Sequence, residues 1–160
     1  MRKDFRVDTD RLRNELPLTS EQVSAVKEYA QKLGMDASKI IHMDWMHTAY
    51  SSEFDEMIIG TDILPSANPT TANSGISLKA AVAHEIVGHR DAALKGWSQP
   101  KDSILPDFML EEIQASIRAA RFTPDLSYPE RVQLLRDAIE RLPEGTRIRD
   151  VKDKLYIEER

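Results

Sequence analysis

The sequence predicts a small α+β domain. Its strongest helical segments cover residues 78–94, 107–120 and 127–142, where apolar side chains recur at helical spacing or a capping box opens the segment. Two short apolar runs, residues 39–43 and 57–63, contain most of the isoleucines of the N-terminal half and predict strands. The length of 160 residues fits one domain over the whole chain, residues 1–160.

The first predicted helix, residues 19–33, begins at a capping box formed by Thr19 and Gln22 and stops before Gly34. One face of this helix is apolar, with Val23, Val26, Tyr29, Ala30 and Leu33. The run SANPTTANSG, residues 66–75, separates the second strand from the next helix and predicts a loop. The N-terminal half therefore supplies one helix and two strands.

The rest of the chain is predicted to be mainly helical. Ser77 opens an apolar helix that runs to about Leu94, and Asp107 is the expected N-cap of the next helix. Ser127 and Glu130 form the capping box of the last predicted helix. The charged side chains of that helix are expected to face solvent; they are Arg131, Arg136, Asp137, Glu140 and Arg141. Residues 146–159 alternate around a polar turn and predict a hairpin.

Composition and charge exclude several classes of function. The formal net charge is -5 and the chain has no basic run, so we expect no nucleic-acid partner. The chain contains no cysteine, so a metal site must use histidine and carboxylate ligands. The polar N-terminus is not a secretory signal, and no segment has the length of a membrane span. We therefore expect a soluble protein without a membrane partner, whose export would need a larger precursor.

The segment AAVAHEIVGHRDA, residues 80–92, carries the most informative chemistry. His84 and His89 flank Glu85, but the two histidines are five residues apart. On a regular α-helix a five-residue step turns the side chain by roughly 140°, so the two imidazoles could not reach one ion. A π-type turn stacks these two positions, and such turns occur mostly at functional sites. Gly88 tolerates the distortion best, so we predict a π-type turn there.

A catalytic zinc takes three protein ligands and keeps one position open for water, so a third ligand is needed beside the two histidines. Glu111 and Glu112 follow His89 by 22 and 23 residues, on the next predicted helix. One of them can bind the ion while the other accepts a hydrogen bond from a ligand imidazole. Glu85 can take a proton from the metal-activated water and pass it to the leaving amine. The alternative is a buried polar cluster without a metal.

The motif HEIVGH, residues 84–89, resembles the HELLGH signature of dipeptidyl peptidase III, a zinc exopeptidase with the same five-residue spacing. The segment EEIQAS, residues 111–116, is similar to the EECRAD/E segment of that family. This resemblance implies that His84, His89 and Glu112 are the ligands of Zn2+. It covers these two segments only, because dipeptidyl peptidase III is several times longer and its motifs lie further apart.

The same resemblance implies that Glu85 is the catalytic base and that Glu111 supports a metal ligand. It also implies a fold of the zincin type, in which a small sheet packs on an active-site helix and a third-ligand helix. The expected function is that of a gluzincin-like metallopeptidase, which hydrolyses a polypeptide substrate. We expect Zn2+ as the cofactor.

A longer pattern resembles the C-terminal domains of bacterial Rhs-type polymorphic toxins. It consists of HEIVGHRDA at residues 84–92 and LEEIQASIRAARFTPDLS at residues 110–127, followed by an arginine-rich helix and a short β tail. This resemblance implies a bacterial toxin module, carried at the end of a very large exported protein. It also implies a protein target in a competing cell and an immunity protein that blocks the site.

Further residues are candidates for substrate contacts. The strand at residues 57–64 (MIIGTDIL) is the candidate sheet edge for a peptide substrate, because it is nearest in sequence to the metal helix. The alternative is that it is an ordinary core strand. His47, Tyr50 and Tyr128 are candidate donors to the oxyanion of the tetrahedral intermediate. Arg118 and Arg121, on the third-ligand helix, could bind a substrate carboxylate, but we expect them to be exposed to solvent.

Two other functions fit the same residues. The first is a non-catalytic protein-binding module that a structural metal stabilises, and the second is a zinc amidase that acts on a non-peptide substrate. A structural metal is closed by a fourth protein ligand, whereas a catalytic metal is accessible to water and substrate. Access to the predicted ligands is therefore the feature that separates the binding module from the enzymes.

Overall fold

The computed structural model describes residues 13–96 and 107–151, and it confirms the predicted α+β class. The described elements are α-helices, short 3-10 turns, one π-helical segment and three strands. In chain order they are α2 (Ser20–Lys32), η1 (Ala37–Lys39), β1 (Ile40–His42), β2 (Ala49–Ser51), β3 (Glu56–Ile59), η2 (Thr61–Ile63), α3 (Ala72–Gly75), α4 (Leu78–Ala83), η3 (His84–Arg90), α5 (Asp91–Leu94), α6 (Asp107–Phe122), α7 (Tyr128–Glu140) and α8 (Ile148–Val151).

The three strands form a mixed sheet in the order β1-β3-β2. β1 pairs with β3 in parallel and β2 pairs with β3 in antiparallel, so that Met57 of β3 lies between Ile40 and Tyr50. Because β3 is the central strand, the prediction that residues 57–64 form the sheet edge is wrong. The edge on the side of the long helix is β2, whose three half-buried residues show no apolar alternation that would have predicted a strand.

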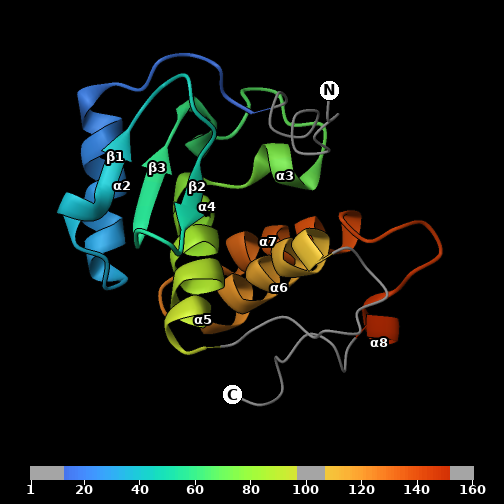
Figure 1. The fold of residues 1–160 in the computed structure, drawn as a ribbon. Helices are drawn as coiled ribbons and strands as arrows, with labels where there is room; N and C mark the ends of the chain where they lie inside the picture. The colour runs from blue at the N-terminus through green and yellow to red at the C-terminus, as the bar shows by residue number, and fades with distance from the viewer. Residues whose placement is uncertain (1–12, 97–106, 152–160) are drawn as a thin grey trace, which may run out of the picture.

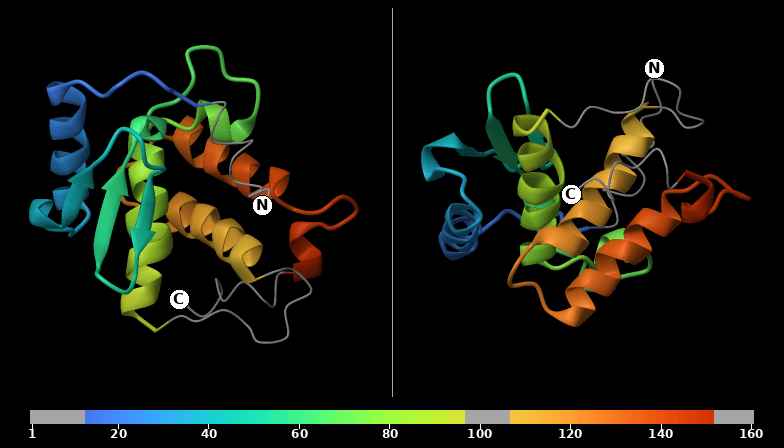
Figure 2. Two further views of the ribbon diagram at one scale, coloured as in Figure 1. Left: turned by 45° about the horizontal axis from the view of Figure 1, so that its top comes forward. Right: turned by 90° about the horizontal axis from the view of Figure 1, so that it is seen from below.

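The predicted helix over residues 78–94 is confirmed as one continuous rod made of α4, η3 and α5. It lies between two layers, with the sheet and α2 on one side and the hairpin of α6 and α7 on the other (Figures 1 and 2). Contacts of η3 with both β2 and α6 hold the rod in this position. The middle of the rod is therefore the place where the sheet edge and the helical hairpin meet.

Local signals place the other helices as predicted. The capping boxes of Thr19 with Gln22 and of Ser127 with Glu130 open α2 and α7. α2 stops before Gly34, whose φ of 96° is a left-handed conformation that glycine adopts without strain. The buried core joins the three layers through Met57, Ile86 and Leu134, each fully buried.

Two predictions for irregular segments need correction. Residues 72–75 of the predicted loop form the one-turn helix α3, which Thr71 caps through the backbone N–H of Ser74. The predicted hairpin at residues 146–159 is wrong over α8, and its remainder lies outside the described residues. No helix in the described ranges combines the length and apolar character that a membrane span requires.

Candidate metal centre

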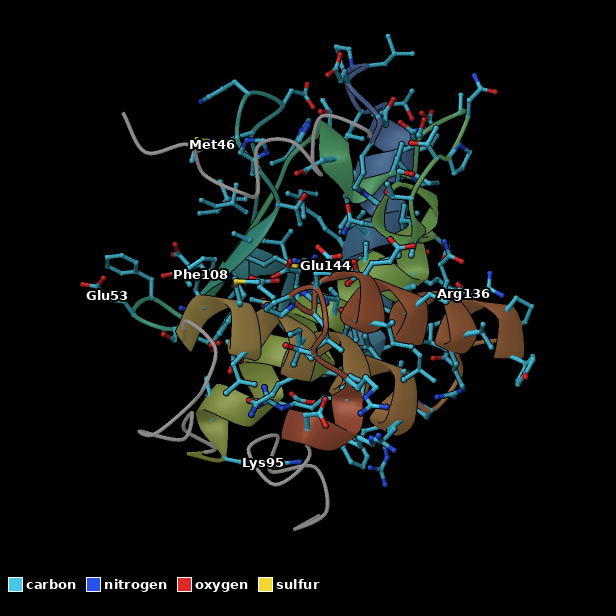
Figure 3. All side chains as sticks on the ribbon, turned by 90° about the vertical axis from the view of Figure 1, so that its right-hand side faces the viewer. Met46, Glu53, Lys95, Phe108, Arg136 and Glu144 are labelled. Carbon is cyan, nitrogen blue, oxygen red and sulfur yellow. The ribbon has the colours of Figure 1, made fainter. Side chains whose placement is uncertain are left out.

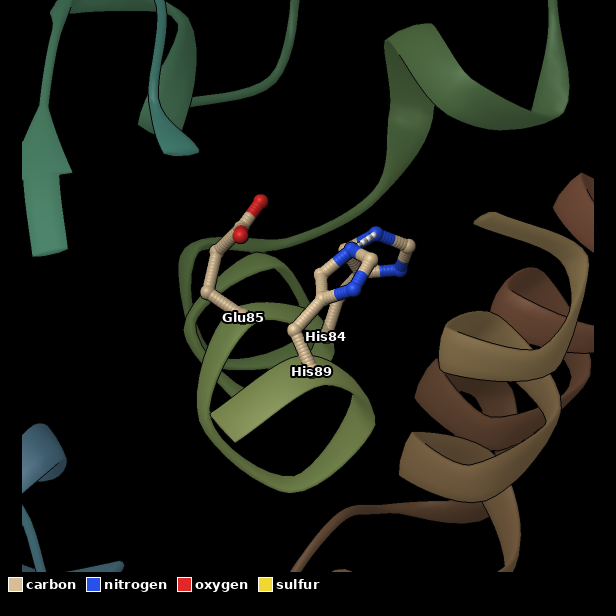
Figure 4. A group of neighbouring side chains, drawn as sticks. All are labelled: His84, Glu85 and His89. Atoms are coloured by element: carbon tan, nitrogen blue, oxygen red, sulfur yellow. Dashed lines mark hydrogen bonds between the residues drawn. The ribbon is translucent and has the colours of Figure 1, made fainter. Parts of the chain in front are cut away.

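The π-helical segment η3 brings the two histidines to one face of the rod, as predicted. The backbone N–H of Asp91 donates to the carbonyl of Ile86, five residues earlier, as expected of a π-turn. The His84 and His89 rings lie edge to face, with centroids 4.8 Å apart and Nε2 atoms 3.2 Å apart (Figure 4). The widened turn therefore overcomes the rotation that a five-residue step would have on a regular helix.

Gly88 has a role that the sequence did not indicate. A Cβ atom built on Gly88 would lie 2.5 Å from the carbonyl oxygen of Ala115 on α6. The φ of Gly88 is not positive, so this position does not need glycine for its backbone conformation. The missing side chain lets η3 and α6 pack closely, which brings Glu111 and Glu112 of α6 to the histidines.

We expect Gly88→Ala to weaken both folding and metal binding. Alanine gains about 1 kcal/mol over glycine from helix propensity, but the clash with the Ala115 carbonyl forces η3 and α6 apart. Overpacking of this kind costs about 1–3 kcal/mol, so we expect the free energy of unfolding to fall by up to about 2 kcal/mol. Urea unfolding and zinc titration measure the two effects. An alanine variant as stable as the parent, with the same zinc affinity, would contradict the packing role.

Glu112 of α6 completes a triangle with the two histidines. Its Oε2 lies 3.1 Å from His84 Nε2 and 3.6 Å from His89 Nε2, and the two nitrogens are 3.2 Å apart. A tetrahedral zinc with bonds of about 2.0–2.1 Å separates its ligand atoms by roughly 3.3–3.4 Å. The three atoms therefore have the mutual spacing of three ligands of one zinc ion, and the donor set fits the metal.

Hydrogen bonds on the far side of each ring orient the histidines. Ser116 Oγ donates to Asp137 at 2.6 Å, so it accepts a hydrogen bond from His84 Nδ1–H at 3.0 Å. His89 Nδ1–H donates to Glu111 Oε1 at 3.2 Å. With a metal bound, both rings would be neutral and would present the lone pair of Nε2 toward Glu112. Two lone pairs and a carboxylate oxygen at these distances repel one another unless a cation, either a proton or a metal ion, lies between them.

The charges around the site favour such a cation. Burial opposes protonation of His89, but the nearby Glu112 carboxylate and the hydrogen bond with Glu111 raise the pKa of His89 to about 10. Burial alone would raise the pKa of Glu112, yet the charge of His89 and the hydrogen bond with His84 hold the pKa well below its usual range. An environment that stabilises an imidazolium so strongly also stabilises a metal ion in its place.

Glu85 lies beside the triangle on the side of the sheet (Figure 4). Among the described residues, His84, Glu85 and His89 form a group that could hold a metal ion, with one ligand atom of each within 4.8 Å of the others. The Oε2 of Glu85 accepts a hydrogen bond from the backbone N–H of Tyr50 at 3.1 Å. Burial is the largest effect on this carboxyl group and raises its pKa.

Asp137 of α7 and Arg141, the C-cap of α7, were expected to face solvent but instead support the site. Asp137 is 2% exposed and accepts hydrogen bonds from Ser116 and Arg141, and Arg141 also lies 3.8 Å from Glu112. The expectation was wrong because both residues lie on the same helical face as Leu134, at spacings of three and seven residues. That spacing is the signal in the sequence that could have revealed them. Arg136 does face solvent (Figure 3).

A cavity of about 620 Å³ opens onto the cluster. Its walls include the predicted ligands and base, the edge strand β2, and Phe108 at the start of α6 (Figure 3). His47 lines this cavity, and its Nδ1 atom forms a hydrogen bond with the carboxylate of Asp62. Tyr50 also lines it, but its hydroxyl donates to Asp55. Tyr128 is 79% exposed and is not a wall residue, so the structure does not bring it to the site.

Comparisons of the chain with protein-family models, curated proteins and solved structures found no match. The resemblances to dipeptidyl peptidase III and to Rhs-type toxin domains therefore stay predictions, as does an immunity partner. The fold and the site define a small α+β domain in which a partly buried histidine–carboxylate cluster lines a cavity.

Proposed function

We propose that this protein is a zinc-dependent hydrolase that cleaves peptide bonds. The observation that carries the proposal is the convergence of His84 Nε2, His89 Nε2 and Glu112 Oε2 on one point of the cavity wall. These three residues would hold the ion, and Ser116 and Glu111 would keep the imidazoles in the required tautomers. Access from the cavity favours a catalytic ion over a structural one.

Zinc in this position would supply the Lewis acidity that polarises a substrate carbonyl and lowers the pKa of a water towards about 7. Glu85 is the residue that moves the proton. Because Tyr50 N–H occupies its Oε2, the Oε1 atom is left to accept the proton of the attacking water. The water oxygen then bonds to the carbonyl carbon, the C–N bond breaks, and Glu85 passes the proton to the leaving nitrogen.

The edge strand β2 favours a peptide as the substrate. The backbone N–H of Tyr50 points out of the sheet toward Glu85, and in an antiparallel pair the N–H and C=O of one residue point to the same side. The carbonyl of Tyr50 therefore also faces away from β3, on the cavity side. An extended peptide chain can donate a backbone N–H to this carbonyl at the sheet edge, which places its amide beside Glu85.

Removal of the metal tests the proposed function. We expect a chelator to reduce the hydrolysis of a fluorogenic peptide library to background, and stoichiometric Zn2+ to restore it. Circular dichroism of the chelated protein checks that the chain remains folded. Peptide hydrolysis that persists after the zinc has been removed would exclude zinc catalysis. A zinc-loaded protein that cleaves simple amides but no peptide would be an amidase, and one that cleaves neither would be a binding module.

A further inference from the structure

Arg118 is a fully buried arginine that the proposed chemistry does not use. It lies on α6, is 0% exposed and is not a wall residue of the cavity, so the expectation of solvent exposure is wrong. Its Nη1 atom donates to the carbonyl of Gly88 at 2.8 Å and to Glu111 Oε1 at 3.0 Å. Its Nη2 atom donates to the side chain of Gln114.

A buried guanidinium is costly to remove from water unless its partners compensate for the lost hydration. The partners of Arg118 are unusual because they belong to both elements of the metal centre. Gly88 lies inside the π-turn that stacks the two histidines, and Glu111 accepts the Nδ1–H of His89. One planar cation thus connects α6, the π-turn and, through one carboxylate, the ring of a predicted ligand.

We propose that Arg118 is a positioning residue for the metal centre, which orients His89 through Glu111 and fixes the π-turn through the carbonyl of Gly88. Its hydrogen bond to Oε1 holds the carboxylate of Glu111 in place as the acceptor for His89 Nδ1–H, so that the imidazole presents Nε2 to the ion. Its fork-shaped group reaches the carbonyl and the carboxylate at once, a geometry that a lysine ammonium does not reproduce. This inference rests on metal binding at the proposed site.

The test compares Arg118→Met with Arg121→Met, a matched control on the exposed side of the same helix. Zinc dissociation constants come from competition with a chelator of known affinity. Residues that orient a metal ligand typically contribute 10- to 100-fold to affinity, so we expect a loss of about that size for Arg118→Met and none for Arg121→Met. Arg118→Lys should recover part of the loss. The visible spectrum of the Co2+-loaded protein should change in the first variant only.

A double-mutant cycle with Glu111→Gln shows whether Arg118 acts through this carboxylate. If the two substitutions act independently, their effects on zinc affinity should multiply to within about twofold. If the two residues belong to one network, the effects should not multiply. We expect the double variant to bind zinc about as weakly as the weaker single variant. Multiplicative effects, or a Co2+ spectrum and zinc affinity equal to those of Arg121→Met, would overturn the inference.

The outcome stays interpretable if Arg118→Met does not fold. The same cycle is then run with Arg118→Lys, which keeps the buried charge, and the unfolding curves of the metal-free proteins report stability separately from affinity. Failure of this inference is distinct from failure of the proposed function. The parent protein would still bind zinc and cleave peptides in the first case, and it would bind no zinc or cleave nothing in the second.

Discussion

Replacement of Glu85 by glutamine is expected to reduce the rate of peptide hydrolysis strongly, while the protein still folds and binds zinc. The amide oxygen of Gln can still accept the hydrogen bond from the backbone of Tyr50, so the local geometry persists. The amide cannot accept a proton from the attacking water. Positioned acid–base groups contribute about 100- to 10,000-fold to rate, so we expect kcat to fall by that factor. Measurement of kcat on the best substrate of the peptide library checks this prediction.

Glu53→Gln is a suitable control for this variant. Glu53 lies on the exposed turn between β2 and β3, outside the cavity. The substitution there makes the same chemical change as Glu85→Gln, so the kcat of the Glu53→Gln variant should equal that of the parent. Metal analysis should find equal zinc in the parent and both variants. A Glu85→Gln protein that hydrolyses peptides at the parent rate would remove Glu85 from the mechanism and favour a site in which the metal is structural.

Replacement of His84 by alanine is expected to remove both the zinc and the activity. The variant loses one of the two proposed nitrogen ligands and leaves an unfilled space beside Glu112 and His89. It also removes the imidazole that hydrogen-bonds the Ser116 hydroxyl, which itself donates to the buried Asp137. We expect metal analysis to find a loss of bound zinc, and the peptide assay to find only background hydrolysis.

His42→Ala controls for the loss of an imidazole elsewhere. His42 ends β1, where it pairs with Asp44 at 2.7 Å, and it is not a wall residue of the cavity. The control variant should keep the zinc content and the activity of the parent. Circular dichroism of His84→Ala establishes whether the chain still folds. Equal zinc in the parent and in folded His84→Ala would show that the ion, if bound, lies elsewhere in the protein.

The sequence alone was sufficient to predict the positions of the long helices. The capping boxes at Thr19 and Ser127 and the apolar run from Leu78 to Leu94 act within a few residues of chain, so local patterns predicted these elements. The five-residue spacing of the histidines also predicted the π-turn, because no regular helix could bring both rings together.

The supporting residues could not be assigned in the same way. Asp137 and Arg141 were interpreted as solvent-exposed charges and Arg118 as a surface residue, yet all three lie against the candidate metal centre. Their roles depend on how α6 and α7 pack against η3, which is a contact between segments distant in the chain. The edge strand β2 was missed for a related reason, since three residues become a strand only by pairing with β3.

What the sequence determined by itself was the α+β class, the course of the long helix and the position of two imidazoles on one face of it. The tertiary structure decided which carboxylate oxygen meets those imidazoles, which strand borders the cavity, and which charges are buried behind them. The physical reason is the range of the interactions. Backbone hydrogen bonds and caps act between near neighbours in the chain, whereas the close contact of Gly88 with Ala115 joins helices that only packing brings together.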